Sequence, residues 1–185
     1  MLGVTRKNLL HLCSRFFRPL PTHMQYLPQS LRRAERALPE EAARELMAHG
    51  IYGVLSLCAP DGAAYGIPLH FAWDGGDKLY FHAAMEGKKL DCLQHEPKVS
   101  FCIVGECAVQ APHFSTTYRS VILEGEAGLV ESPEEKKMAL HLLLAKYTPG
   151  EMKAGLQYAE RALHKTQIIR LTINSWCGKH GFKTP

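Results

Sequence analysis

The stretch Leu79–Phe101, LYFHAAMEGKKLDCLQHEPKVSF, joins a strand, a turn, a short helix and the start of another strand. Its strand ends in small residues and leads through Gly87 into Lys88 and Lys89 at the start of the helix. Free N–H groups at a helix N-terminus and lysine ammonium groups attract anions, and glycine lets an anion approach the backbone. The stretch therefore predicts a phosphate site, although two solvated lysines beside an ordinary turn explain the same residues.

Short strands and tight turns surround this stretch, and helices are added late. Alternating apolar residues and turn signals predict strands over 51–58, 64–71, 78–82, 98–104, 117–130 and 166–173. Apolar periodicity and helix start and stop signals predict helices over 39–49, 86–93, 133–147 and 151–163. Pro68 cannot donate to a ladder, so its strand is expected at an edge or a bulge. These elements predict a mainly β protein with added helices, a six-stranded antiparallel split β-barrel rather than a doubly wound sheet.

Length and charge narrow the class of protein. The 185 residues, 46% of them hydrophobic, suit one core and one domain. The first 34 residues hold six basic residues and no acid, so the rest carries 16 basic residues against 18 acids. This balance disfavours a nucleic-acid-binding body, and no apolar stretch is long enough to span a bilayer. We expect a basic extension over 1–33, packed on the body or on a partner subunit, and one domain over 34–185.

The cysteines and histidines form no recognisable motif. The six cysteines include no C-x-x-C pair, and several lie in apolar, strand-like runs. We interpret them as buried thiols in a reducing compartment, the cytoplasm, with a disulfide, metal or redox role as the alternative. The ten histidines are scattered without an i,i+4 pair, so no metal site is predicted.

Three separated motifs resemble a known family. They are the opening stretch, YRSVILEGEAGLVESPEEKKMAL over 118–140, and IIRLTINSWCGK over 168–179. In this order they resemble the pyridoxamine 5'-phosphate oxidase-like flavoproteins, in the branch of the nitroimidazole-resistance reductases. The resemblance covers roughly Ala34 to Lys179. It implies an FMN-binding split barrel, built as a homodimer with two flavin sites at the subunit interface.

The resemblance also implies where the phosphate and ring of FMN bind. The phosphate-binding segment falls on His82, Ala83, Lys88 and Lys89, with the two lysines as the phosphate contacts. The strand whose backbone lies along the isoalloxazine contains Ile67, Pro68 and Leu69. Other branches begin this strand with an arginine that grips the phosphate, and none stands here, so phosphate binding depends more on the lysines.

Further site residues come from the other two motifs. Tyr118 and Ser120 match a strand that approaches the flavin from the dimer side; an ordinary strand with an exposed arginine is the alternative. Trp176 and Lys179 match the closing W-x-G-K, which implies an aromatic ring beside the flavin and a cation near its polar edge. An interfacial tryptophan in a C-terminal tail is the alternative there.

His82 is the candidate catalytic residue. It matches a histidine close to the flavin in nitroimidazole-resistance proteins, and strand alternation places it opposite Leu79 and Phe81. A neutral imidazole can hydrogen-bond a substrate or deliver a proton; a structural histidine is the alternative.

The expected function is an FMN-dependent oxidoreductase that reduces nitroaromatic or similar small acceptors. The cofactor supplies the electron chemistry, and a small-molecule donor such as NAD(P)H would bind transiently, because no nicotinamide-binding fingerprint is present. A non-catalytic FMN carrier or redox sensor, and a split barrel that binds haem or a deazaflavin, remain alternatives. No nucleic-acid or membrane partner is expected.

Overall fold

The computed structural model describes residues 24–181, in which one eight-stranded sheet is accompanied by four α-helices. The sheet order is β3-β2-β6-β7-β8-β5-β4, and β1 pairs parallel to β8. The strands are β1 Gln25–Tyr26, β2 Gly53–Cys58, β3 Ala64–Leu69, β4 Ala72–Trp73, β5 Lys78–Ala83, β6 Lys98–Gln110, β7 Ser115–Leu129 and β8 Gln167–His180. All other pairings are antiparallel, which confirms the predicted fold class.

The six expected strands are present, and the sheet has two more, β1 and β4, of two residues each. Two expected strands are also much longer than predicted. β6 continues through a register shift between Val104 and Cys107, and β8 continues to His180 because β7 pairs with it to its end. Pairing with a neighbour thus extends strands through residues with little β-propensity of their own. As Pro68 indicated, β3 is an edge strand, paired with β2 alone among the described strands.

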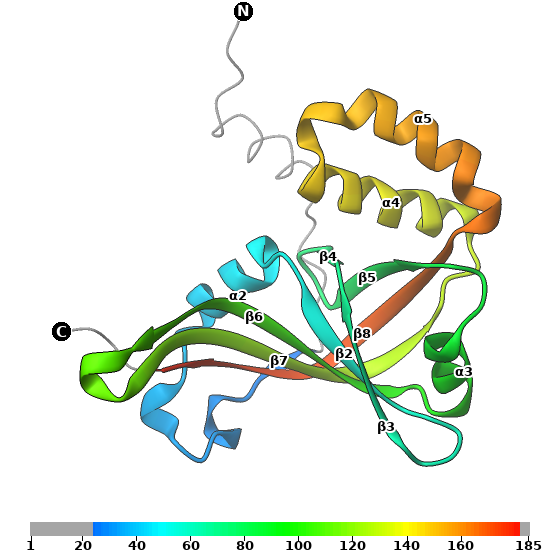
Figure 1. Cartoon of the computed structure of the whole chain (residues 1–185). Helices are drawn as coiled ribbons and strands as arrows, with labels where there is room; N and C mark the ends of the chain where they lie inside the picture. The colour runs from blue at the N-terminus through cyan, green and yellow to red at the C-terminus, as the bar shows by residue number, and fades with distance from the viewer. Residues whose placement is uncertain (1–23, 182–185) are drawn as a thin grey trace, which may run out of the picture.

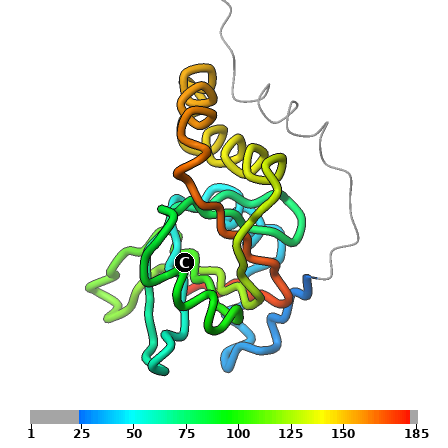
Figure 2. Tube along the Cα trace, turned by 90° about the vertical axis from the view of Figure 1, so that its right-hand side faces the viewer, coloured from blue at the N-terminus to red at the C-terminus, as the bar shows by residue number. Residues whose placement is uncertain are grey.

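The helices occupy two sides of the sheet (Figures 1 and 2). Helix α2, Glu40–His49, buries Ala43, Leu46 and Met47 against the main core. Helices α4, Pro133–Tyr147, and α5, Met152–Ala162, form a hairpin beyond the opposite side. The short helix α3, Lys88–His95, connects β5 to β6.

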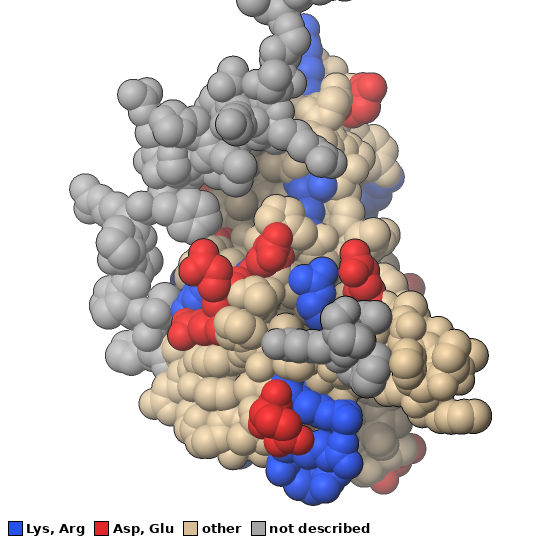
Figure 3. Space-filling view, turned by 90° about the vertical axis from the view of Figure 1, so that its left-hand side faces the viewer, with Lys and Arg blue, Asp and Glu red and all other residues tan. Residues whose placement is uncertain are grey.

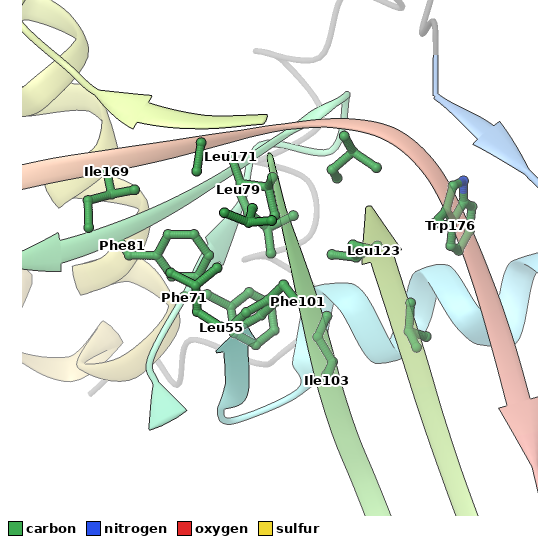
Figure 4. Packing of buried hydrophobic residues seen from close by; sticks show 14 of the residues in the cluster. Leu55, Phe71, Leu79, Phe81, Phe101, Ile103, Leu123, Ile169, Leu171 and Trp176 are labelled. Atoms are coloured by element: carbon green, nitrogen blue, oxygen red, sulfur yellow. The ribbon is translucent and has the colours of Figure 1, made fainter. Parts of the chain in front are cut away.

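One aromatic cluster forms the centre of the core (Figure 4). Phe71, Phe81 and Phe101 are fully buried, and the Phe101 ring lies edge-on to both others, with centroids 5.2 and 4.9 Å apart. The hydroxyl of Tyr147 ties α4 to this cluster. It donates to the carbonyl oxygen of Ile51 at 2.6 Å and accepts from the Phe71 N–H at 3.0 Å. The end of α4 is therefore fixed beside the chain that leaves β3.

Part of the expected N-terminal extension is packed against the sheet. Residues 1–23 of it lie outside the described residues. In the remainder, Met24 is buried in the core, and the Tyr26 ring packs against Trp176 of β8 at a tilt of 51°, with ring centroids 4.6 Å apart. Two short 3-10 helices, η1 Pro28–Ser30 and η2 Ala34–Arg36, follow before α2.

The cysteines are less uniformly buried than the sequence indicated. The described ones are free thiols, but only Cys92 is fully buried, and Cys107 is exposed. Cys107 stands after the register shift in β6, where the strand pairs with β7 and no longer with β2. The prediction of buried thiols is therefore wrong for Cys107, and Cys13 lies outside the described residues.

Candidate functional site

His82 stands near the end of β5, on the face opposite Leu79 and Phe81. Those two side chains belong to the main core, whereas Tyr80, on the His82 side, packs under α4. Partial burial lowers the pKa of His82 below its ordinary value of 6.5, and the charges of nearby His70 and Lys89 lower it further. His82 is therefore neutral at pH 7, with a ring that can donate or accept one hydrogen bond.

The lysine pair begins α3 immediately after Gly87, whose backbone conformation suits glycine better than other residue types. Gly87 has φ 127° and ψ 161°, a conformation that side chains with a Cβ rarely adopt. The Gly87 carbonyl accepts from the N–H groups of Leu90 and Asp91, at 2.8 and 3.4 Å. The N–H groups of the first turn, at Lys88 and Lys89, precede these bonds and have no helical partner. Free amide donors and two lysines thus stand at one helix end, an arrangement that suits an anion.

Strand β3 lies beside this helix end. The Lys88 ammonium is 4.8 Å from the centroid of the Tyr65 ring, near the start of β3. His70, just beyond the end of β3, is close enough to His82 for its charge to lower the pKa of His82. Between them, Ile67 and Leu69 pack inward on the core while Pro68 is exposed. One edge of β3 has no strand partner in the part of the chain that the structure describes.

These residues form what we call the His82 group: Ile67, Pro68, Leu69, His82, Ala83, Lys88 and Lys89. The contact of Lys88 with Tyr65 and the effect of His70 on His82, at the two ends of β3, place this strand beside the other four residues. They offer donors and positive charge for a phosphate, an exposed strand edge that can hydrogen-bond a flat polar ring, and a neutral imidazole nearby. A phosphate joined to a heterocycle is the chemistry that this arrangement fits.

Three other predicted residues form a separate Lys179 group: Tyr118, Ser120 and Lys179. Ser120 pairs with Lys179 across the β7–β8 ladder, and the Lys179 ammonium lies 5.9 Å from the centroid of the Tyr118 ring. Strand alternation points these side chains away from the core, since their neighbours Val121 and Gly178 are buried. On the sheet, β6 and β2 separate them from β3. Within one chain, the two groups are not brought together.

Trp176 belongs to neither group. It is 2% exposed and lies in the core, with Tyr26 on one side and the Arg44 guanidinium 5.0 Å from its ring centroid (Figure 4). Its indole nitrogen is buried and has no hydrogen-bond partner among residues 24–181. In the described chain, Trp176 therefore packs the 24–38 segment and α2 onto β8.

Sequence reasoning missed several residues near the site. Tyr65 and His70 lie within the predicted ring strand, at its two ends, but were not among the predicted site residues. His70 also stacks on Tyr147, with ring centroids 4.7 Å apart. Lys146 was not singled out because its α4 sequence looks amphipathic; its amine is buried without a hydrogen-bond partner among the described residues, 3.6 Å from the Phe71 ring centroid.

The described residues include neither a metal-binding cluster nor a membrane-spanning helix. Within residues 24–181, no group of three or more His, Cys, Asp or Glu side chains is placed to hold a metal ion. No helix in the same range has both the length and the apolar character needed to cross a membrane.

Solved structures with this fold come from several bacteria. A candidate 5-nitroimidazole antibiotic resistance protein from Bacteroides thetaiotaomicron is 21% identical, with a TM-score of 0.66 over 77% of this chain and 84% of that one. A flavocytochrome from Azotobacter vinelandii is 22% identical, with a TM-score of 0.69 over 84% and 73%. An FAD- and haem-binding protein from Mycobacterium smegmatis is 21% identical, with a TM-score of 0.66 over 81% and 75%.

These structures share the split-barrel fold. No protein of curated function matches the chain. The family is shown by its sequence model, described as pyridoxamine 5'-phosphate oxidase, which matches residues 39–180 and so contains every residue of both groups. The chain belongs to the pyridoxamine 5'-phosphate oxidase family.

Proposed function

We propose that this protein binds FMN at a site shared by two copies of the chain and reduces nitroaromatic or similar small acceptors. The observation that carries the proposal is the His82 group, in which a lysine pair at a helix N-terminus lies beside a free strand edge and a neutral histidine. Flavin binding by relatives of the same fold, including the FAD- and haem-binding protein of M. smegmatis, supports the choice of cofactor.

Each part of the group has a role in this proposal. Lys88, Lys89 and the first-turn N–H groups hold the phosphate, where their positive ends meet its negative charge. The free edge of β3 binds the polar edge of the ring through its backbone groups. Bound flavin supplies two-electron redox chemistry, and the protein contributes orientation, electrostatics and access. His82, neutral at pH 7, hydrogen-bonds the acceptor and holds a proton beside it.

The homodimer is proposed to complete the site with the Lys179 group. Those three side chains point outward from a sheet face that also carries an apolar row. In that row Cys102 pairs with Ile122, which pairs with Cys177; Ile122 is 39% exposed, and Val104, beside the row, is 37% exposed. A second copy that covers this face would bury the row and bring its own residues to the site.

The first test of the proposal is the visible absorption spectrum of the purified protein, followed by mass identification of any chromophore released on denaturation. Flavin absorption with release of FMN is the expected result. Release of FAD would retain the flavin and correct its identity. A haem spectrum would favour the alternative of a haem-binding split barrel, in which His82 and His70 are the imidazoles available to bind the iron. A colourless protein that does not bind added FMN would contradict the proposal.

Turnover needs a separate test, because a flavin carrier would pass the first one. The flavin-loaded protein should oxidise NADH or NADPH when a nitroaromatic acceptor is added, at a rate that depends on both. Absence of turnover with every donor and acceptor pair would leave a flavin-binding protein without this activity.

A further inference from the structure

A basic pocket lies between the 24–38 segment and the end of β8. Its volume is about 260 Å3, and its lining consists of Leu31, Arg32, Arg33, Arg36 and Lys179. Four of these residues are cationic, and within the described residues the lining contains no acid. Figure 3 shows the Lys and Arg side chains that gather near the lower end of this face, with one acidic patch beside them.

The backbone holds the walls of the basic pocket in place. The N–H of Leu27 donates to the Trp176 carbonyl at 2.9 Å, before the arginines, and the N–H of Leu38 donates to the Gly178 carbonyl at 3.0 Å, after them. A Cβ at Gly178 would lie 2.7 Å from the Cβ of Ala43 and 3.0 Å from that of Leu38, so glycine permits this close approach. The arginines are therefore carried by a segment fixed to β8 at both ends.

Three arginines elsewhere in the described chain have carboxylate partners, and the pocket arginines have none among residues 24–181. Arg44, Arg119 and Arg170 each have a glutamate oxygen within 4 Å, at 2.7, 3.7 and 3.1 Å. No ion pair joins Arg32, Arg33 or Arg36 to another described residue, although Glu35 is in the same short helix. The backbone thus holds four positive charges close together without a described counter-charge, and an anion in the pocket would relieve their repulsion.

We propose that the basic pocket binds the diphosphate group of a small nucleotide through its arginines, at a site that shares Lys179 with the proposed dimer site but is distinct from the phosphate site of Lys88 and Lys89. Guanidinium groups match phosphate oxygens with paired hydrogen bonds, and several of them together favour a ligand with more than one negative charge. The pocket is small and lies between one short segment and the end of one strand, which suits a compact group rather than a nucleic-acid strand. The identity of the nucleotide rests on the proposed oxidoreductase function. For that function, a dinucleotide electron donor carries a diphosphate group.

The test measures binding of pyrophosphate, ADP and orthophosphate by calorimetry to the full-length protein as purified. Wild type should bind pyrophosphate and ADP more tightly than orthophosphate, with affinity that falls as salt is added. The variant Arg32→Gln/Arg36→Gln should weaken pyrophosphate and ADP binding by at least about tenfold. The exposed Arg33→Gln provides a second variant in case the double variant folds poorly.

The matched control, Lys153→Gln/Arg161→Gln, removes the same charge from exposed positions on α5 and should change binding by less than about twofold. Equal weakening in the control, unchanged binding in both pocket variants, or no binding of either diphosphate by wild type would overturn the proposal. So would loss of the bound chromophore in the pocket variants, because the pocket would then belong to the cofactor. Failure of the oxidoreductase function alone would appear as a colourless protein that still binds ADP.

Discussion

The His82 group and the Lys179 group lie in the same sheet but are held in different ways. The His82 group depends on a strand end, a glycine in a left-handed conformation and the first turn of a helix. The Lys179 group stands near one end of the long β7–β8 ladder, where Ser120 pairs with Lys179 and Tyr118 pairs with Cys107 of β6. The first group has donors free for a ligand, whereas in the second the backbone is engaged and only side chains can bind.

This difference suits the two groups to different roles in one site. Backbone donors and lysines that are not used by the fold can hold a cofactor, while side chains on a rigid ladder can close over it from a second copy. Substitutions in each group, and dilution of the protein, can show whether the two groups act in this way.

Removal of the lysine pair should have the largest effect. Lys88→Ala/Lys89→Ala should weaken FMN binding by about a hundredfold or more, since each lysine that contacts phosphate contributes about 1.5 kcal/mol or more. Flavin release measured by fluorescence on dialysis gives the affinity. The control Lys137→Ala/Lys153→Ala removes two exposed lysines from α4 and α5 and should retain flavin. Unchanged flavin binding in the first variant would refute the phosphate assignment.

Dilution should separate the two groups without any substitution. A site built from two chains is lost when they dissociate, so flavin content and dimer content should fall over the same range of protein concentration. Sedimentation velocity with detection at the flavin wavelength and at 280 nm measures both together. A monomer that sediments with flavin attached would show that the His82 group suffices alone.

Substitution of His82 should affect turnover more than binding. His82→Ala should keep FMN and lower the rate of acceptor reduction by about tenfold or more, because a positioned hydrogen-bonding group is lost. Since the pKa of His82 lies below 6.5, the wild-type rate should fall as the solution is acidified through that pKa, and the variant should lack this limb. His141→Ala, exposed on α4, is the matched control. Equal rates and pH profiles would make His82 a structural residue.

The smallest expected effect is a change in the free energy of unfolding on substitution of Lys146, at the end of α4. Burial lowers the pKa of Lys146 from 10.5 to about 7, a cost that the face of the Phe71 ring offsets only in part. The cost is full below pH 7 and disappears as pH rises through 10.5, where the unfolded chain also loses the proton. Lys146→Met should therefore stabilise the fold by about 1–2 kcal/mol at pH 6 and by less at pH 9.

Urea unfolding at both pH values measures this gain, with the exposed Lys137→Met as control. A loss of stability on Lys146→Met at pH 6 would mean that the amine has a stabilising role that its buried contacts do not reveal.

The sequence could predict the His82 group because most of it is local. His82, Gly87, Lys88 and Lys89 are close in the chain, and a strand followed by a helix is enough to bring them together. The six strands were predictable for the same reason, as runs of alternating residues between turn signals. The extra length of β6 and β8 was not, because it comes from pairing across the sheet rather than from local propensity.

What escaped prediction depends on distant contacts. Trp176 is buried because β1 and Arg44 cover it, and neither is near it in sequence. The basic pocket needs Arg32 and Arg36 to meet Lys179, which is more than 140 residues away. The basic character of the N-terminal region was evident from composition, but its partner on β8 was not.

Mixed dimers test the shared site most directly. One chain carries Lys88→Ala/Lys89→Ala, the other carries Tyr118→Ala/Lys179→Ala, and different affinity tags allow the mixed dimer to be purified. If each site combines the His82 group of one copy with the Lys179 group of the other, one of the two sites in the mixed dimer is intact. We expect about one tightly bound FMN per mixed dimer, and weak binding by either variant as a homodimer. Binding in the mixed dimer no better than in the two homodimers would contradict a site shared between copies.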